Sequence, residues 1–218
     1  MLITFSGIDG AGKSTQIERV KTALEKQGYN VKCLWARGGY TPGFEWLKGV
    51  MRFVLRHKLP QSGNSPQRQK VFQRRGVSEI WLSIAIVDLI FFWCIWTRLY
   101  TLLGFVVVCD RYIEDTELDF RRNFDRLNID EKRLWRLLRW MIPKPDASFV
   151  LWLPIDEVLN RQRQKLEPFP DDRETLSWRL EQYADELLFP STGFVRVDCR
   201  GAIDSVEHTV WQHIIRLL

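Results

Sequence analysis

The nonapeptide GIDGAGKST, residues 7–15, constrains the fold of this 218-residue chain more than any other feature. It matches the pattern G-x4-G-K-[ST], with Gly7, Gly12, Lys13 and Ser14 at the fixed positions. Glycines at this spacing let backbone N–H groups close around a polyphosphate at the start of a helix. The motif therefore predicts a phosphate-binding loop that connects a strand to a helix.

Apolar, β-branched runs alternate with segments whose apolar residues recur at helical spacing. The runs predict five strands, at residues 2–5, 31–35, 105–109, 147–153 and 195–198, and a closing amphipathic helix covers residues 206–218. Crossovers of this length require a parallel sheet with helices on both faces. We therefore expect one α/β domain over residues 1–218, with the three-layer fold typical of proteins that carry this loop.

Two segments stand apart from this alternation. Residues 58–75 are mostly polar and include two prolines, which predicts an exposed insertion loop. The stretch KLEPFPDD, residues 165–172, interrupts two helical patterns in a charged region. We expect residues 160–175 to form a lid that closes over a bound nucleotide.

Composition limits the kinds of binding partner and the cellular compartment that we expect for this chain. A net charge of +5 favours anionic ligands such as phosphates, but it is too small to indicate nucleic acid, and we expect no nucleic-acid partner. The four cysteines show no metal-binding spacing and fit a reducing compartment. The first residues, MLITFSG, show neither a basic lead nor a cleavage site, so we expect a cytoplasmic protein.

The apolar stretch IWLSIAIVDLIFFWCIW, residues 80–96, is interrupted only by Ser83 and Asp88. A helix of this length spans about 25 Å, less than the roughly 30 Å of a bilayer core. A carboxylate at its centre would also be unfavourable in lipid. A buried or dimer-interface helix is favoured, and weak membrane association is the alternative that the tryptophans keep open.

The loop assigns chemistry to individual residues. Lys13 would neutralise charge between the β- and γ-phosphates of ATP, and Ser14 would offer its hydroxyl to Mg²⁺. Asp110 follows the apolar run FVVVC. Its carboxylate is the expected second protein ligand of that metal, through water. A single aspartate at the end of a strand can instead cap a helix, so its context in the sheet decides.

Phosphoryl transfer depends on positioning and on neutralising charge, so arginines should converge on the transferred group. Arg111 directly follows Asp110 at the carboxyl edge of the sheet, where ligands collect in open α/β folds. Arg37 holds the corresponding end of the second strand, and Arg161 and Arg163 lie in the charged lid region. We expect Lys13 and these arginines to act on the phosphates.

Five stretches in this order resemble the thymidylate kinase family of P-loop nucleoside monophosphate kinases: FSGIDGAGKSTQ, VVVCDRY, KPDASFVLWLPIDEVLNRQ, WRLEQY and VRVDCRG. The resemblance covers nearly the whole chain. It implies a sheet of order 2-3-1-4-5, ATP and Mg²⁺ as cofactors, a small-molecule phosphate acceptor, and a homodimer formed through residues 80–100. Ala11 stands where some members carry an arginine, so the lid arginines would supply that charge.

The loop and the resemblance together predict two sets of binding residues. The ATP-binding set is Gly7, Gly10, Gly12, Lys13, Ser14 and Thr15, with Cys199 and Arg200 bordering the adenine. The acceptor-binding set is Asp9, Arg37, Asp88, Arg111, Tyr112 and Asp115.

The chain departs from the family in the acceptor half. Asp88 is followed by Leu89 where members carry an arginine that reads the base, and IEDTELDF replaces the serines and Ala-Tyr-Gln that follow Asp-Arg-Tyr. WARGGYTPG also replaces the element REPGG. A site that lacks a hydrogen-bonding partner for a base discriminates poorly in favour of that base. We therefore expect thymidylate to be a poor acceptor.

Three functions remain open on the sequence. The first is an ATP- and Mg²⁺-dependent kinase of a nucleoside monophosphate or another phosphorylated small molecule. The second is a kinase of a hydroxyl on a sugar, nucleoside or lipid-linked precursor, with Asp110, Asp115 or Asp119 as general base. The third is a regulatory protein that binds ATP without turnover.

Overall fold

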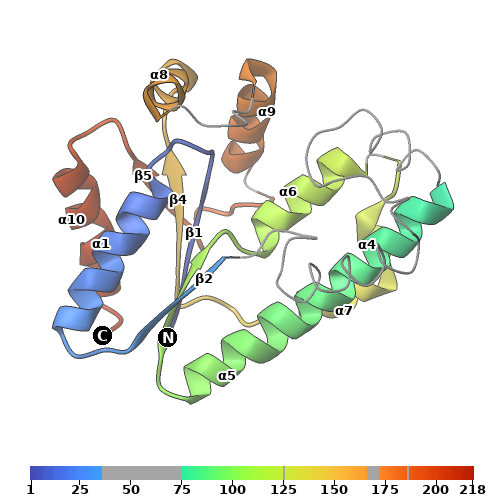
Figure 1. Ribbon diagram of the computed structural model, residues 1–218, viewed down its shortest axis with the longest axis horizontal. Coiled ribbons are helices and arrows are strands. Elements are labelled where there is room, and N and C mark those ends of the chain that lie inside the picture. The colour runs from blue at the N-terminus through green and yellow to red at the C-terminus, as the bar shows by residue number, and fades with distance from the viewer. Residues whose placement is uncertain (36–74, 125, 166–171, 186) are drawn as a thin grey trace. The chain divides into compact units, whose positions relative to one another are not determined.

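The computed structural model describes residues 1–35, 75–124, 126–165, 172–185 and 187–218 (Figure 1). The predicted insertion at residues 58–75, apart from its last residue, lies outside the described residues, as do Arg37 and residues 166–171 of the predicted lid.

The chain divides into two compact units. The first consists of Met1–Trp35, Leu99–Leu118 and Lys144–Leu218, and the second consists of Ala36–Arg98 and Asp119–Pro143. The first unit holds the whole sheet and the glycine loop, and the second holds most of the apolar helix. The single domain expected from the sequence stays a prediction.

The first unit is an alternation of strands and helices. Its elements are β1 (Leu2–Gly7), α1 (Lys13–Lys26), β2 (Val31–Trp35), β3 (Val106–Asp110), β4 (Ala147–Trp152), α8 (Ile155–Lys165), α9 (Arg173–Ala184), β5 (Val195–Asp198) and α10 (Ile203–Ile214). Two helices, α5 (Thr97–Leu102) and α6 (Ile113–Asn123), cross the boundary between the units.

The five strands form one parallel sheet in the order β2-β3-β1-β4-β5, as the sequence predicted. The central strand β1 pairs with β3 and β4, so that Thr4 lies beside both Cys109 and Ser148. All six residues of β1 are buried, as is typical of a central strand in a parallel sheet. The fold is the α/β architecture of P-loop proteins.

Helix α1 begins directly after the glycine loop and packs against α10 and the sheet (Figure 1). Its residues Ile17, Val20 and Leu24 are buried, in agreement with the helical spacing read from the sequence. Helices α8 and α9 lie at the end of the sheet toward which β4 points (Figure 1). The loop is therefore at the carboxyl edge of the sheet, where parallel folds bind ligands.

The second unit is built around the apolar helix. Its elements are α4 (Arg75–Leu89), a π-helical segment η1 (Ile90–Trp96), a short 3-10 helix η2 (Ile129–Glu131) and α7 (Arg133–Met141). Phe120 stacks edge-on to Trp135 at 5.9 Å, and Trp81 meets Phe124 at 5.4 Å between ring centroids. Aromatic packing of this kind forms the core of the unit.

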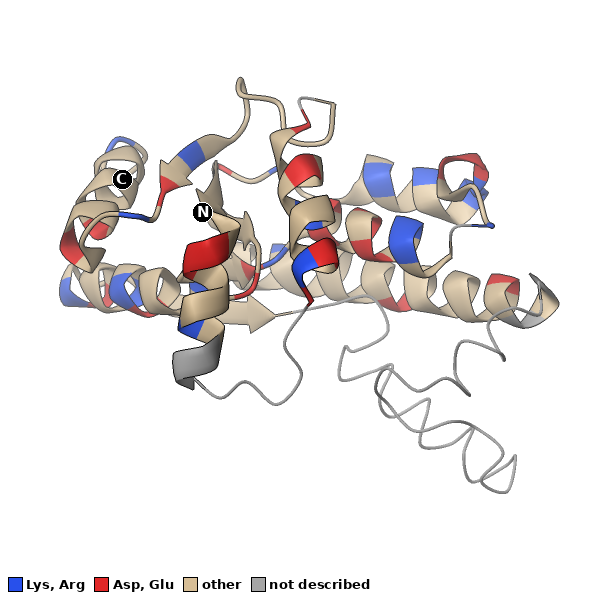
Figure 2. Ribbon diagram, turned by 90° about the horizontal axis from the view of Figure 1, so that it is seen from above, with Lys and Arg blue, Asp and Glu red and all other residues tan. Residues whose placement is uncertain are grey.

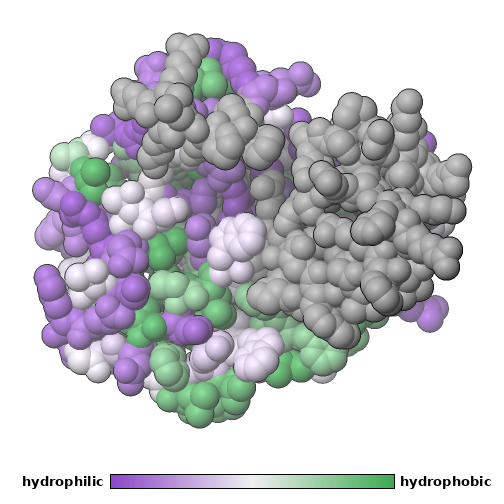
Figure 3. All heavy atoms as spheres, viewed as in Figure 1, coloured by the Kyte–Doolittle hydropathy of each residue, from purple (hydrophilic) through white to green (hydrophobic). Residues whose placement is uncertain are grey.

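The continuous helix Ser78–Leu102 is long and apolar enough to cross a membrane by length and composition alone, as the core helix of a soluble protein also can be. Its most apolar window has a mean hydropathy of 2.0, and 39% of that window is buried. Phe91, Ile95 and Trp96 are exposed, and Leu102 is 84% exposed. Hydrophobic side chains also gather at the lower edge of Figure 3, where α5 lies in Figure 1.

Charged side chains are distributed differently. In the described part of the chain, Lys and Arg lie interspersed with Asp and Glu over the helices (Figure 2). Arg19 of α1 joins both Asp204 and Glu207 of α10, which shows how such neighbours pair across two helices. Exposed pairs of this kind contribute little to stability.

Gly7 ends β1 in a conformation that glycine alone adopts easily, with φ of +137°. A Cβ there would lie 2.5 Å from the carbonyl oxygen of Leu151. We expect Gly7→Ala to lower the free energy of unfolding by about 2 kcal/mol or more, through strain and this clash. Gly28 is the matched control, because its φ is +89° and nothing lies within 4 Å of its added Cβ.

Urea unfolding of both variants measures the difference. Gly28→Ala should lose about 1 kcal/mol through backbone strain alone. Equal losses in the two variants would contradict the proposed contact between Gly7 and β4.

Candidate nucleotide-binding site

The loop after β1 has the backbone shape of an anion site. Gly7, Gly10 and Gly12 have φ of +137°, +90° and +96°. Gly12 caps α1 with no side-chain hydrogen bond, and the first turn of the helix holds no acidic residue. The N–H groups of that turn thus have no capping side chain, and the helix dipole favours negative charge there. Ser14 and Thr15 are exposed in this turn, as binding of a nucleotide requires.

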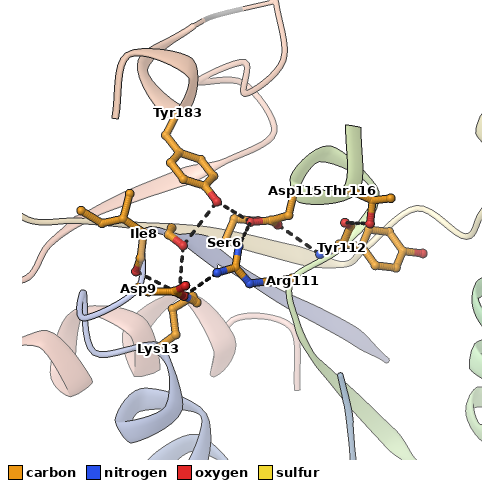
Figure 4. A network of polar contacts seen from close by, with 10 residues as sticks. Ser6, Ile8, Asp9, Lys13, Arg111, Tyr112, Asp115, Thr116 and Tyr183 are labelled. Carbon is orange, nitrogen blue, oxygen red and sulfur yellow. Dashed lines mark hydrogen bonds and ion pairs between the residues drawn. The ribbon is translucent and has the colours of Figure 1, made fainter. Parts of the chain in front are cut away.

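Lys13 is folded over the loop (Figure 4). Its Nζ donates to the carbonyl oxygens of Gly7 at 2.8 Å and Ile8 at 2.9 Å, and lies 3.5 Å from Oδ1 of Asp9. Burial lowers the pKa of Lys13, and the nearby Arg111 lowers it further. A polyphosphate in the loop would supply the negative charge that the buried ammonium needs.

Asp110 ends β3 at the same edge of the sheet. Its Oδ1 is buried and has no hydrogen-bond partner among the described residues. Burial raises the pKa of this carboxyl above its ordinary value, although Lys13 and Arg111 act in the opposite direction. The side chain therefore retains a carboxylate oxygen whose bonding capacity is unused within the described protein.

These residues fit Mg²⁺. The ion usually binds through one or two carboxylates together with water and substrate phosphates, rather than in a full protein cage. The described residues accordingly hold no group of three or more His, Cys, Asp and Glu side chains that could enclose a metal. Ser14 and Asp110 are the residues that would hold the ion beside a nucleotide.

Arg111 is the only described residue other than glycine with a positive φ, at +72°. Its N–H donates to the carbonyl oxygen of Phe5 at 2.8 Å, which attaches it to β1. The side chain is 4% exposed; one guanidinium nitrogen lies 2.5 Å from Oδ1 of Asp9 and the other 3.6 Å from Oδ1 of Asp115. A left-handed backbone at a bulky residue is strained, and such strain clusters at functional sites.

Asp115 lies in the first turn of α6 and is 1% exposed. Its Oδ2 accepts from the Ser6 hydroxyl at 2.6 Å and from the Tyr112 N–H at 3.1 Å. Its Oδ1 accepts from the Tyr183 hydroxyl at 2.6 Å (Figure 4). The acceptor-binding role assigned to Asp115 stays a prediction, and the structure adds that this carboxylate is a buried junction.

The sequence did not identify Ser6 and Tyr183 as parts of the site, and it did not predict α6. A signal for α6 existed, because Glu114 and Asp115 give its first turn the acidic character typical of a helix start. Tyr183 stands in the WRLEQY stretch, but nothing local indicates a partner 68 residues away. Tyr112 is 1% exposed, and its N–H serves Asp115, whereas its role toward an acceptor stays a prediction.

The residues predicted near adenine lie together beyond β5. Arg161 of α8 donates to the carbonyl oxygen of Cys199 at 3.2 Å and pairs with Glu157. Burial raises the pKa of the Cys199 thiol to about 11, so it stays neutral. Arg200 is exposed, pairs with Asp198 and lies 5.5 Å from the Trp152 ring. An exposed guanidinium over an indole provides a flat surface of the kind that a base can stack on.

The remaining predicted residues either lie in the second unit or have side chains outside the described residues. Arg163 lies in α8 by its backbone, and its side chain is outside the described residues, as is Arg37. Asp88 is half-buried in α4, within the second unit. Asp119 is buried in the same unit.

Comparison with known proteins shows that the chain is similar in sequence to several thymidylate kinases. A thymidylate kinase from Herpetosiphon aurantiacus is 27% identical over 169 residues, which are 78% of this chain and 64% of that protein. A probable thymidylate kinase from Methanosphaera stadtmanae is 23% identical over 220 residues, 100% of this chain and 99% of that protein. A thymidylate kinase from Chlorobium phaeobacteroides is 59% identical over 63 residues, 29% of this chain and 28% of that protein.

The alignments with the Herpetosiphon and Chlorobium proteins span less than two thirds of those relatives' length. No family model matches the chain.

Replacing Asp110 with Asn tests how much the buried negative charge of Asp110 destabilises the folded state. Because burial raises its pKa, the charged carboxylate destabilises the folded state at neutral pH. We expect Asp110→Asn to raise the free energy of unfolding at pH 7 by on the order of 1 kcal/mol. The gain should be lost as the pH falls through the raised pKa toward the ordinary value of 3.8.

The same variant should bind Mg²⁺ about 10- to 100-fold more weakly in the presence of nucleotide. The control is Asp198→Asn, because the hydrogen bond from Arg200 lowers the pKa of Asp198, and its replacement should act on stability in the opposite sense. Urea unfolding between pH 4 and pH 7 gives both signs. A loss of stability in Asp110→Asn at pH 7 would contradict the conclusion that burial of the charged Asp110 carboxylate destabilises the folded state.

Proposed function

We propose that this chain, which is thymidylate kinase-like in its sequence and has the α/β fold of P-loop proteins, is an ATP-dependent kinase. Its acceptor would be a nucleoside monophosphate or a related phosphorylated small molecule. One observation carries the proposal: Lys13 from the donor loop and Arg111 from the end of β3 both contact the same oxygen, Oδ1 of Asp9. Two cations that converge on one anionic oxygen are suited to stabilise the charge of a phosphoryl group that takes its place.

Each residue has a role in this reaction. Lys13 would neutralise the phosphates of the donor, and Arg111 would bind the acceptor phosphate as a fork of two N–H donors. Asp9, freed from both cations, would accept a hydrogen bond from a hydroxyl of the acceptor. Ser14 and Asp110 would hold Mg²⁺, which supplies charge neutralisation when it is bound with ATP. Arg161 and Arg163 would add positive charge from the lid side.

Thymidylate is a doubtful acceptor under this proposal. Asp115 contributes a buried carboxylate 3.6 Å from Arg111, which reduces the positive potential that the guanidinium offers to a phosphate. Asp88 is followed by Leu89, where members of the family carry the arginine that reads the base. Both differences lie at or beside residues assigned to the acceptor.

A hydroxyl-directed kinase is the second candidate, and Asp110 favours it. A carboxyl whose pKa is raised by burial, with one oxygen that no described residue bonds, has the properties of a general base. Asp115 suits that role less, because Ser6, Tyr112 and Tyr183 already donate to it.

The proposal also includes an oligomeric state and a location. The exposed residues Ile80, Phe91, Ile95 and Trp96 support a homodimer formed through the apolar helix, because large exposed apolar groups usually mark an interface. Weak membrane contact through this face is the alternative. A cytoplasmic location accords with the soluble nucleotides that such a kinase would use.

Lys13→Ala tests whether the chain is an enzyme. We expect acceptor-dependent ADP production to fall by about 100-fold or more, because one electrostatic contact in a phosphoryl-transfer site is worth that much. Lys26→Ala is the matched control, since Lys26 is exposed in the last turn of the same helix. The assay follows ADP across nucleoside monophosphates, sugar phosphates, nucleosides and sugars, and no acceptor-dependent ADP from the unchanged protein would rule out both kinase candidates.

Arg111→Lys separates the two candidates. Lysine keeps the charge but lacks the two-pronged donor geometry, so a phosphate-bearing acceptor should show a KM about tenfold higher, with the KM for ATP unchanged. Arg121→Lys is the control, because Arg121 is 41% exposed in the second unit and pairs with Asp130. An unchanged acceptor KM would contradict the phosphate clamp and favour the hydroxyl-directed candidate.

A further inference from the structure

A buried hydroxyl connects α9 to the candidate site. Tyr183 of α9 is 2% exposed, and its O–H donates to Oδ1 of Asp115 at 2.6 Å. The same O–H lies 3.3 Å from the carbonyl oxygen of Gly7, where the phosphate loop begins (Figure 4). Helix α9 starts at Arg173, inside the predicted lid. One side chain thus touches both halves of the site from an element that contains no residue assigned to substrate.

Asp115 links Tyr183 to Arg111. Its carboxylate receives hydrogen bonds from Ser6, Tyr112 and Tyr183, and its Oδ1, the oxygen bound by Tyr183, also lies 3.6 Å from the Arg111 guanidinium. The Tyr183 contact is short and charge-assisted, which makes it one of the strong bonds of the group. Loss of that donor would leave Oδ1 held only by the arginine.

Arg111 needs such support. Its backbone is in the left-handed region, and its guanidinium lies between two carboxylates, those of Asp9 and Asp115. A strained backbone persists only where surrounding contacts determine it. Asp9 is 39% exposed, whereas Asp115 is 1% exposed and fixed by donors from three elements or their ends. The rigid side of the arginine is therefore the Asp115 side.

We propose that Tyr183 is a positioning residue, which holds Asp115 and through it sets the placement of Arg111 relative to the phosphate loop. A displacement of α9 would then move the acceptor clamp and the Gly7 carbonyl together. Burial, together with the charge of Asp115, keeps the pKa of the Tyr183 phenol well above its ordinary value, so the group stays a donor at every physiological pH. The consequence for the acceptor rests on the proposed kinase function, whereas the placement of Arg111 does not.

Tyr183→Phe in the full chain tests this with little loss of packing, since it retains the ring, whose centroid lies 4.9 Å from that of Phe189. Ser148→Ala is the matched control, because it removes another buried hydroxyl contact of the same sheet, 3.0 Å from Thr4, outside this group. The first readout is the rate at which phenylglyoxal modifies Arg111, followed by peptide mass spectrometry without any substrate. Arg179, 3% exposed and also in α9, is the internal reference.

We expect Tyr183→Phe to raise the modification rate of Arg111 about tenfold relative to Arg179, as loss of a hydrogen bond to a charged group implies. Ser148→Ala should leave that ratio unchanged. The second readout is kinetic: the acceptor KM should rise by a similar factor while the KM for ATP stays constant.

Each outcome decides the proposal. Equal acceleration at Arg111 and Arg179, or none at either, would show that Tyr183 only packs α9, and it would overturn the positioning role. An unchanged acceptor KM in an active variant would overturn it as well. If the unchanged protein phosphorylates no acceptor, the proposed kinase function fails, and the ratio of modification rates still decides whether Tyr183 places Arg111.

Discussion

The site depends on one shared anion, Oδ1 of Asp9. Lys13 and Arg111 are 7% and 4% exposed, and two buried cations so close to each other are unfavourable unless an anion joins them. The lowered pKa of Lys13 shows that burial and the charge of Arg111 outweigh the help that Asp9 gives. A polyphosphate would compete with Asp9 for the same two cations, and the loop glycines leave the first turn of α1 open to it.

Much of the frame that holds this anion was predictable from sequence. β2 and β5 have the predicted bounds, although they are the edge strands of the sheet and are only partly buried. The strand order followed from the family resemblance and is confirmed. The loop was identifiable because its chemistry is local: the glycines, the lysine and the hydroxyl are all within nine consecutive residues.

The contacts that the sequence could not provide are those between distant residues. Ser6 and Asp115 are 109 positions apart, and Tyr183 and Gly7 are 176 apart, so no local pattern connects them. The π-helical turns of η1 were also not predicted, because their apolar sequence IFFWCIW fits an α-helix equally well. In each case the determining factor is tertiary packing, which periodicity does not contain.

The charges around Asp9 also separate the two kinds of acceptor. The described group comprises two cations, Lys13 and Arg111, and three carboxylates, those of Asp9, Asp110 and Asp115. A phosphate acceptor must displace Asp9 from Arg111 and then share the guanidinium with Asp115, which cannot withdraw because Ser6 and Tyr183 hold it. A hydroxyl acceptor leaves the ion pair intact and needs only a neighbouring ionised carboxylate to take its proton. Because Asp115 is held rigidly, a phosphate-bearing acceptor can bind only if its binding energy is large enough to separate Arg111 from Asp9.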